Sequence, residues 1–193
     1  FKWKIFSNFP IFSRKMKELE TAPTKSLNDH VIILGGGRAG KYLATELSRK
    51  HRVIVMDHDP QVIAYFRAKN IPAVFGNAHN LEILDKMGVE KAKLLVCALP
   101  DMDETLFVVD YVKHHFPRLK IFAKANYYED SLKLYKRGAD YVVLTEIIGG
   151  FIFLENVEYY LKKGKLLNSV NMITLKERIY EERESTHGVR HLL

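Results

Sequence analysis

The sequence predicts an α/β protein with a Rossmann-like, doubly wound, six-stranded parallel sheet. Three observations support this fold: apolar runs alternate with helical segments, the first run ends in a glycine-rich loop, and the second ends in an aspartate. Parallel strands need crossover helices, and right-handed crossovers place helices on both faces of a sheet. We therefore expect the strand order 3-2-1-4-5-6, with both faces covered, in one domain of residues 27–145.

Six short, mainly apolar runs have the length of strands that are buried on both faces. We expect these strands at residues 30–34, 53–56, 73–75, 94–98, 120–123 and 141–144. Helices are expected between them, at about 39–50, 60–69, 81–87, 103–115 and 130–137. Their ends carry ordinary signals, because Pro60 suits a first helical position and Gly88, Pro117 and Gly138 suit helix ends.

A loop rich in glycine follows the first strand. Its sequence, Gly35-Gly36-Gly37-Arg38-Ala39-Gly40, matches G-x-G-x-x-G and opens a predicted helix. In such loops the first glycine permits a tight turn, the second lets the backbone approach a phosphate, and the third lets helix and strand pack closely. The free N–H groups of the helix N-terminus then face the anion. Arg38 either adds a charged fork for phosphate or is an exposed residue at the helix start.

An acid, Asp57, ends the second strand 20 residues after Gly37. An acid at this place accepts hydrogen bonds from ribose hydroxyls and disfavours a 2′-phosphate, so NADP is not expected. Together the loop and the acid predict that the chain binds a nucleotide. The alternative is a Rossmann scaffold with an empty cleft.

Several motifs together resemble one family, the regulator-of-potassium-conductance or TrkA N-terminal domain, over about residues 29–162. The motifs are residues 31–40, 56–60, 76–79, 99–105, 123–126 and 137–140. Residues 57–60 and 113–119 are most similar to the C-terminal cytosolic domain of Kef-type monovalent cation:proton antiporters. The resemblance implies a regulatory domain that binds an adenine nucleotide, dimerises and gates an attached membrane protein. AMP is the nucleotide expected for an antiporter, with ADP, ATP or NAD(H) as alternatives.

The resemblance also implies which residues bind the nucleotide. Asp57 would hold the ribose, while Asn77 and Ala78 would contact the adenine edge. Arg38 and the amides of the glycine loop would hold the phosphate. Ala98, Leu99 and Asp101 would close the cleft on the opposite side. The remaining members of the site are His58, Asp59 and Lys124.

The sequence departs from the family pattern at two places. Asn77 replaces the usual acid and His79 the usual threonine of a Gly-Asp-Ala-Thr motif. Since asparagine both donates and accepts hydrogen bonds, adenine recognition survives while the negative charge at the site falls. Asn126 stands where glutathione-gated Kef proteins have an arginine, which argues against regulation by glutathione.

A predicted helix at 146–163 follows the sixth strand. Its apolar residues recur at helical spacing: Ile147, Phe151, Leu154, Val157 and Tyr160 or Leu161. Such a stripe either packs into the core or contacts a second subunit. Because the family uses this helix to cross over to a partner, we expect a homodimer through helix 146–163.

The two ends of the chain differ from the predicted domain. Residues 1–26 form a basic leader that also contains Phe1, Trp3, Phe6, Phe9 and Phe12. Such a segment suits a membrane surface or the stretch after a membrane helix; nucleic acid and a solvated leader are the competing interpretations. We expect a transmembrane cation transport domain, N-terminal in the same polypeptide, and no nucleic acid partner. The location would be the cytoplasmic face of the membrane. Residues 165–193 are a charged tail.

Other reactive residues have ordinary explanations. His58, His79, His114 and His115 lack metal-ligand spacing, and the last two are adjacent on a helix and are not expected to face one site. Cys97 lies inside an apolar strand and is expected in the core. The acids Asp101, Asp103 and Glu104 would cap a helix, with a divalent-ion site as the alternative. No metal site is predicted.

The competing class of protein is a nicotinamide-dependent oxidoreductase with the same fold. Hydride transfer needs a further domain or long insertions that carry the substrate and acid–base groups. Residues 165–193 are too few and too charged for such a domain, so we expect no enzyme activity. The gating domain of a potassium channel or of a Trk or Ktr uptake system shares the same site residues and is the second alternative.

Overall fold

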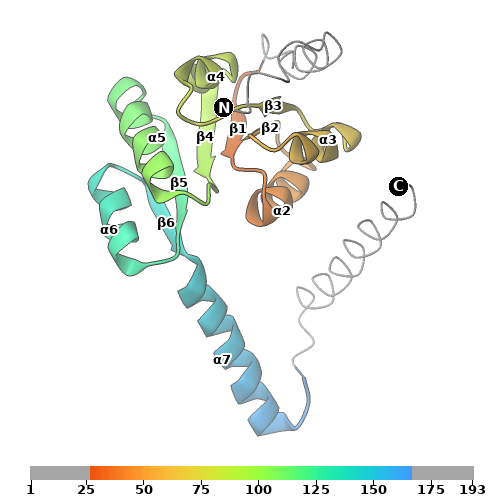
Figure 1. Cartoon of the computed structure of the whole chain (residues 1–193). Helices are drawn as coiled ribbons and strands as arrows, with labels where there is room; N and C mark the ends of the chain where they lie inside the picture. The colour runs from red at the N-terminus through yellow and green to blue at the C-terminus, as the bar shows by residue number, and fades with distance from the viewer. Residues whose placement is uncertain (1–26, 167–193) are drawn as a thin grey trace, which may run out of the picture. The chain divides into compact units, whose positions relative to one another are not determined.

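The computed structural model describes residues 27–166, in which six parallel strands form one sheet (Figure 1). The strands are β1 (His30–Leu34), β2 (Val53–Asp57), β3 (Ala73–Phe75), β4 (Ala92–Cys97), β5 (Lys120–Ala125) and β6 (Tyr141–Leu144). Their order is β3-β2-β1-β4-β5-β6, as predicted. The central pair, β1 and β4, forms the switch point of the topology, and doubly wound sheets bind ligands at the carboxyl ends of such strands.

Helices connect consecutive strands. They are α2 (Arg38–Leu47), α3 (Pro60–Ala68), α4 (Leu81–Lys86), α5 (Met102–His115) and α6 (Tyr128–Lys136). Asp59, Asn80 and Asp101 each accept a backbone N–H in the first turn of the helix that follows them, so the acids and amides at these junctions start α3, α4 and α5. A short 3-10 helix, η2 (Val89–Lys91), was not predicted. It begins after Gly88, whose φ of 72° turns the chain out of α4.

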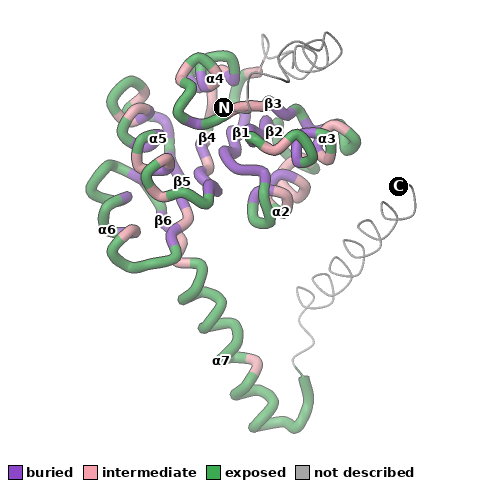
Figure 2. The backbone as a smooth tube through the Cα atoms, viewed as in Figure 1, coloured by how far each residue is buried: buried purple, intermediate pink, exposed green. Residues whose placement is uncertain are grey.

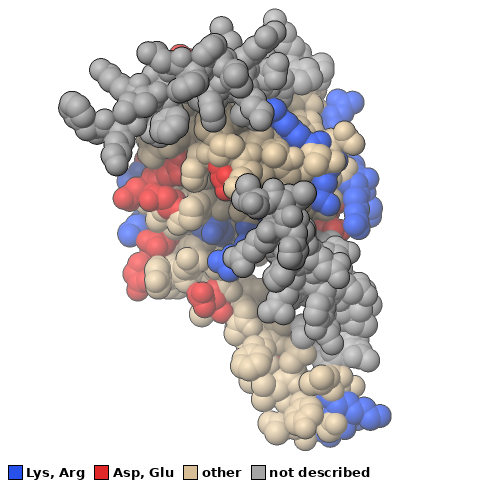
Figure 3. All heavy atoms as spheres, turned by 45° about the vertical axis from the view of Figure 1, so that its right-hand side comes forward, with Lys and Arg blue, Asp and Glu red and all other residues tan. Residues whose placement is uncertain are grey.

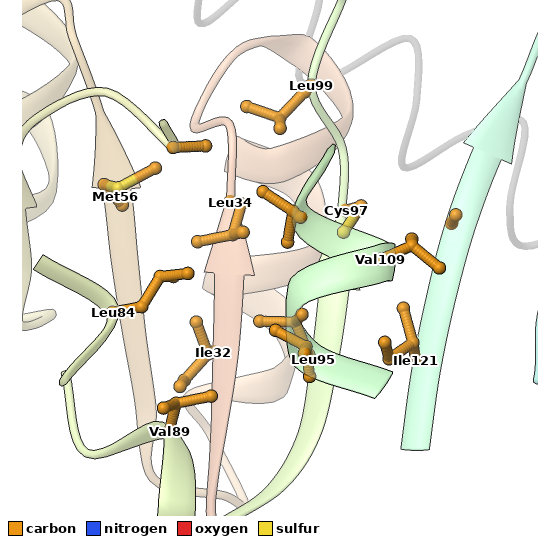
Figure 4. Close-up of a cluster of buried hydrophobic side chains, with 14 of the residues drawn as sticks. Ile32, Leu34, Met56, Leu84, Val89, Leu95, Cys97, Leu99, Val109 and Ile121 are labelled. Carbon is orange, nitrogen blue, oxygen red and sulfur yellow. The ribbon is translucent and has the colours of Figure 1, made fainter. Parts of the chain in front are cut away.

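The sheet separates two hydrophobic clusters. On one face, alternate residues of the central strands pack against α4, α5 and α6; Figure 4 shows Ile32, Leu34, Leu95, Cys97 and Ile121 among them. On the other face, the intervening residues of β1 and β2 pack against α2 and α3 around the fully buried Phe66. The two-residue period of a strand therefore divides each apolar run between the clusters, as expected for strands buried on both sides.

The prediction that helices cover both faces holds only for part of the sheet. α2 and α3 pack on β1, β2 and β3, whereas α4, α5 and α6 all lie on the opposite face. On β5 and β6 the face away from α5 and α6 carries Phe122 and Tyr141, which are 40% and 48% exposed with ring centroids 5.1 Å apart. Among the connecting helices α2 to α6, α2 and α3 cover this face, because the crossovers toward β2 and β3 use it and the later crossovers use the other.

The last described helix, α7 (Thr145–Lys163), follows β6 directly. The chain divides into two compact units between Glu146 and Ile147, so most of α7 belongs to the second unit. No residue of α7 is buried in the structure as described (Figure 2). Within the described part of the chain, no helix has the length and apolar character needed to cross a membrane. The predicted basic leader and all but the first two residues of the predicted tail lie outside the described residues.

Candidate nucleotide-binding site

The glycine loop between β1 and α2 is tightly packed. Gly35 adopts a φ of 90°, and a Cβ on it would lie 2.9 Å from the backbone of Ala98. A Cβ on Gly40 would lie 1.9 Å from the carbonyl oxygen of Gly35. Gly35 therefore permits the turn and Gly40 permits the close approach of α2, which are the roles that the motif predicts for its first and last glycines.

The two middle glycines have different roles. A Cβ on Gly36 would lie 2.6 Å from Val62 and 2.7 Å from Phe66, so the absence of a side chain there makes room for α3. The motif did not predict this requirement, because its second position accepts any residue. A Cβ on Gly37 would meet no atom within 4 Å. The fold therefore does not require glycine at position 37, and the space in front of the loop stays open there.

The N-terminus of α2 has the features of an anion site. Gly37, Arg38 and Ala39 are exposed, whereas Gly36 and Gly40 on either side of them are buried. No side chain caps the helix at Gly37, and its first turn contains no acid. The first N–H groups of a helix lack partners within the helix, and its dipole places partial positive charge at this end. A phosphate could bind these groups beside the Arg38 guanidinium.

Asp57, the predicted ribose ligand, is buried at the end of β2. Its Oδ2 accepts the Gly36 N–H at 2.7 Å, and its Oδ1 accepts the Asp59 N–H at 2.8 Å. The carboxylate thus fixes both the glycine loop and the start of α3. Each carboxylate oxygen has two lone pairs, so Asp57 retains capacity to accept hydrogen bonds from hydroxyl groups.

Two further predicted site residues, His58 and Asp59, directly follow Asp57. The His58 ring is exposed, with its Nδ1 3.8 Å from Oδ1 of Asp57. Asp59 uses its own Oδ1 to accept the Gln61 N–H at 2.8 Å, which caps α3. Both residues lie at the same end of the sheet as the glycine loop, as the sequence predicted, but the Asp59 carboxylate has a structural role there.

The predicted adenine edge lies in the loop 76–80 between β3 and α4. Oδ1 of Asn77 accepts the His79 N–H at 2.8 Å, so the Asn77 side chain organises its own turn. Ala78 is fully buried, and its N–H donates to Oε1 of Glu104 at 3.0 Å. The sequence predicted Glu104 as a helix-capping acid, with a divalent-ion site as the alternative. It gave no signal of this contact, because the two residues lie 26 positions apart.

The predicted opposite wall is formed at the end of β4. Ala98 and Leu99 are buried, and the Ala98 N–H donates to the Leu34 carbonyl at 2.8 Å, next to the glycine loop. Oδ1 of Asp101 accepts the Glu104 N–H at 2.8 Å and caps α5. Lys124 lies on β5, two strands from β1, between Ala123 and Ala125, which belong to the α5 and α6 face. Its side chain therefore projects on the same face as Phe122.

The remaining reactive residues give no catalytic or metal centre in the described residues. Cys97 is in the core, as predicted, and burial raises the pKa of its thiol to about 12. No group of three potential metal ligands occurs between residues 27 and 166. The prediction that His114 and His115 cannot face one site was wrong: their ring centroids lie 4.8 Å apart, and both line one shallow hollow with Tyr111 and Arg137. Both histidines lie in the last turn of α5, which ends at His115.

The family model of the TrkA-N domain matches residues 31–145, more than half of the chain. The chain belongs to the TrkA-N domain family. This confirms the resemblance that the motifs indicated, and every predicted site residue of this TrkA-N domain lies within the matched range.

This TrkA-N domain is similar to the glutathione-regulated potassium-efflux system protein KefC of Klebsiella pneumoniae (strain 342), with 32% identity over 111 residues. The match covers 57% of this chain and 18% of KefC, so the chain spans about a fifth of the length of the curated relatives it matches.

Solved structures extend the comparison. The TrkA-N domain of inner membrane protein ybaL from Escherichia coli has a TM-score of 0.64 and 28% identity, covering 67% of this chain and 97% of that one. The Kef CTD of Shewanella denitrificans in AMP bound form has a TM-score of 0.58 and 22% identity, covering 82% and 94%. The second likeness shows the shared fold.

Proposed function

We propose that this TrkA-N domain binds an adenine nucleotide at the carboxyl ends of β1 and β4 and thereby regulates transport of a monovalent cation across a membrane. The observation that carries the proposal is the open space at Gly37, in front of the uncapped N-terminus of α2 and beside the buried Asp57. The helix terminus and Arg38 would hold the phosphate, and Asp57 would accept the ribose hydroxyls.

AMP is the proposed ligand. The likeness to Kef proteins supports it, since the Kef CTD structure contains AMP. A monophosphate also suits the site, because Arg38 is the one basic side chain in the loop from Gly35 to Gly40. ADP, ATP and NAD(H) use the same ribose and phosphate contacts and are the alternatives. The buried carboxylate of Asp57 would repel a 2′-phosphate, which disfavours NADP.

The proposed partner is a membrane transport domain for K⁺ or Na⁺ in exchange for protons. The likeness to KefC supports this partner, and the basic leader would join the two parts if the transport domain precedes residue 1. The domain would then lie at the cytoplasmic face of the membrane. Binding at the carboxyl ends of the strands would alter the equilibrium between two arrangements of the assembly, which is how a ligand gates a transporter.

We propose that a second copy of the chain packs against the apolar surface of α7. Its predicted stripe is exposed, and the apolar side chains of Ile148, Ile152 and Phe153 are exposed on other sides of the helix. In Figure 3 the visible surface of α7 is almost free of charge until the lysines of its last turn. Residues 147–154 of α7 include no charged side chain, whereas Glu155, Glu158 and the two lysines follow toward its end. An exposed apolar helix surface of this kind is ordinarily buried against a partner, so we infer that two copies of α7 bury it in a homodimer.

Isothermal titration calorimetry on the full chain tests this function. AMP, ADP, ATP, NADH and NADPH are titrated in turn, and at least one of the first four should bind with a Kd of micromolar order, with NADPH the weakest. Absence of binding by all five would contradict the proposal. Oxidation of NADH in the presence of a small carbonyl substrate would instead favour the oxidoreductase alternative.

A further inference from the structure

Glu104 joins two segments that flank the proposed cleft. It lies in the first turn of α5, which follows the central strand β4, whereas loop 76–80 follows the edge strand β3. Its Oε1 accepts the Ala78 N–H at 3.0 Å and lies 3.8 Å from Nδ1 of His79. The carboxyl side chain is only 14% exposed, so this contact is shielded from solvent.

The surroundings of Glu104 favour a charged side chain at this place. The N-terminus of α5 carries partial positive charge, which stabilises a carboxylate in the first turn. Oδ1 of Asp101 accepts the Glu104 N–H and holds the backbone of that turn. The His79 ring lies over Phe107 of the same helix, with ring centroids 4.9 Å apart. Loop 76–80 is therefore held against α5 at two consecutive residues, Ala78 and His79.

Both ends of the loop are fixed by its own side of the sheet. The Gly76 N–H donates to the Asp57 carbonyl at 2.9 Å, and the Asn80 side chain caps α4 by accepting the Glu82 N–H. The Asn80 N–H donates to the Asn77 carbonyl, and Oδ1 of Asn77 accepts the His79 N–H, and both of these bonds lie within the loop. Between the fixed ends, the bond from the buried Ala78 N–H to Glu104 joins the residue next to Asn77 to α5.

We propose that Glu104 is a positioning residue for the base of the nucleotide: its carboxylate fixes loop 76–80 so that Asn77 faces the adenine. This inference rests on the proposed nucleotide site. Because the Ala78 N–H is already bonded to Glu104, it is Asn77 that presents hydrogen-bonding groups to the base from this loop. Glu104 acts on the base through the loop and contacts neither the ribose nor the phosphate.

Glu104 is proposed to affect binding of the base and not of the ribose or phosphate. Two ligands that differ only in the base therefore test its role. AMP contains the base, whereas ribose 5-phosphate lacks it and retains the groups proposed to contact Asp57 and the α2 N-terminus. Replacing Glu104 by alanine leaves the buried Ala78 N–H without its acceptor and frees the loop. Because the freed loop no longer holds Asn77 in place before binding, we expect AMP affinity to fall about tenfold. The affinity for ribose 5-phosphate should stay within about twofold.

The experiment compares Glu104→Ala, Glu104→Gln and the neighbouring exposed acid variant Asp103→Ala, each titrated with both probes after its thermal unfolding has been measured. Glutamine keeps an oxygen that accepts the Ala78 N–H, so Glu104→Gln should retain AMP affinity within about threefold, and Asp103→Ala should match the wild type. If Glu104→Ala does not fold, Glu104→Thr, whose side chain is too short to reach Ala78, provides the same comparison.

Three results would overturn the proposal: wild-type AMP affinity in Glu104→Ala, equal losses for AMP and ribose 5-phosphate, or no recovery in Glu104→Gln. If the wild type binds neither probe, the nucleotide site itself is wrong, and Glu104 has no base to position. The wild-type titration therefore distinguishes failure of the function from failure of this inference.

Discussion

The carboxylate of Asp57 accepts the Gly36 N–H at 2.7 Å, which joins the acid at the end of β2 to the glycine loop at the end of β1. The two features from which nucleotide binding was predicted are therefore in direct contact. Its other oxygen accepts the Asp59 N–H at 2.8 Å, so a single buried carboxylate orders the loop and the start of α3. Under the proposed function, Asp57 serves both ligand binding and local stability.

Replacing Asp57 should therefore affect both the stability of the domain and its affinity for AMP. Asp57→Ala leaves two backbone N–H groups without their acceptor, and we expect a loss of about 1–3 kcal/mol in the free energy of unfolding. AMP affinity should also fall at least tenfold, because the ribose hydroxyls lose their acceptor. Urea unfolding and calorimetry measure the two effects. Asp85→Ala, at an exposed acid on α4, is the control. A destabilised variant with wild-type AMP affinity would show that the ribose binds elsewhere.

The glycine loop provides a matched pair of variants. A methyl group on Gly37 has open space, whereas one on Gly40 would collide with the Gly35 carbonyl oxygen. We therefore expect Gly37→Ala to keep wild-type stability within about 0.5 kcal/mol and to lose AMP binding, because the methyl group occupies the phosphate space. Gly40→Ala should destabilise or unfold the domain. Thermal unfolding followed by titration of each variant checks this, and full AMP affinity in Gly37→Ala would refute a phosphate at this loop.

Asp140 should make stability depend on pH. Burial acts to raise its pKa, but hydrogen bonds from Lys113, Lys120 and the Ile121 N–H outweigh burial and lower the pKa from 3.8 to about 2. The unfolded chain therefore binds the proton more readily, so this stabilisation is complete above about pH 4 and is lost as the pH falls toward 2. After allowance for screening of a partly exposed carboxylate, it amounts to about 1–2 kcal/mol.

Asp140→Asn tests this relationship. At pH 7 the variant should lose about 1–2 kcal/mol, and the difference from the wild type should shrink as the pH falls below 4. Glu90→Gln, which removes an exposed ion pair with Lys91, is the control and should change stability little. Urea unfolding between pH 2 and 7 measures all three proteins, and a difference that does not vary with pH would contradict the assignment.

The proposed homodimer depends on the apolar surface of α7. Phe151 and Leu154 are 63% and 53% exposed, and neither is needed by the core of the described chain. The double variant Phe151→Asp, Leu154→Asp should be a folded monomer with wild-type AMP affinity, because the substitutions remove apolar contact area and leave the cleft unchanged. Light scattering measures the mass. A dimer that persists would exclude α7 from the interface, and an unfolded chain would make it part of the core.

The sequence predicted the order of the strands because local patterns determine it. The first three apolar runs end at Gly35, Asp57 and Gly76, and parallel strands of this length permit few connections. The roles of Gly35 and Gly40 followed from the same register, whereas the hydrogen bond between Asp57 and Gly36 was not predicted. The uncovered face at Phe122 and Tyr141 could not be predicted from apolar runs, because a strand covered on one face and a strand covered on both have similar composition.

The features that were missed depend on distant or three-dimensional contacts. Gly36 must be glycine because Val62 and Phe66 of α3 lie against it, and no local motif contains that information. Glu104 contacts Ala78 across 26 residues, so a sequence window shows only a helix-capping acid. The rings of the two adjacent histidines in the last turn of α5 lie close together, which helical spacing alone does not reveal.

The central claim is that a nucleotide phosphate binds at the N-terminus of α2. The most direct test is the backbone amide NMR spectrum of the ¹⁵N-labelled chain during titration with AMP. We predict that the largest shifts occur at the amides of residues 36–40 and 57–59 and saturate with the calorimetric Kd, and that Gly37→Ala abolishes them. Shifts confined to the hollow around His114 and His115, or the absence of any shift at saturating AMP, would contradict the account.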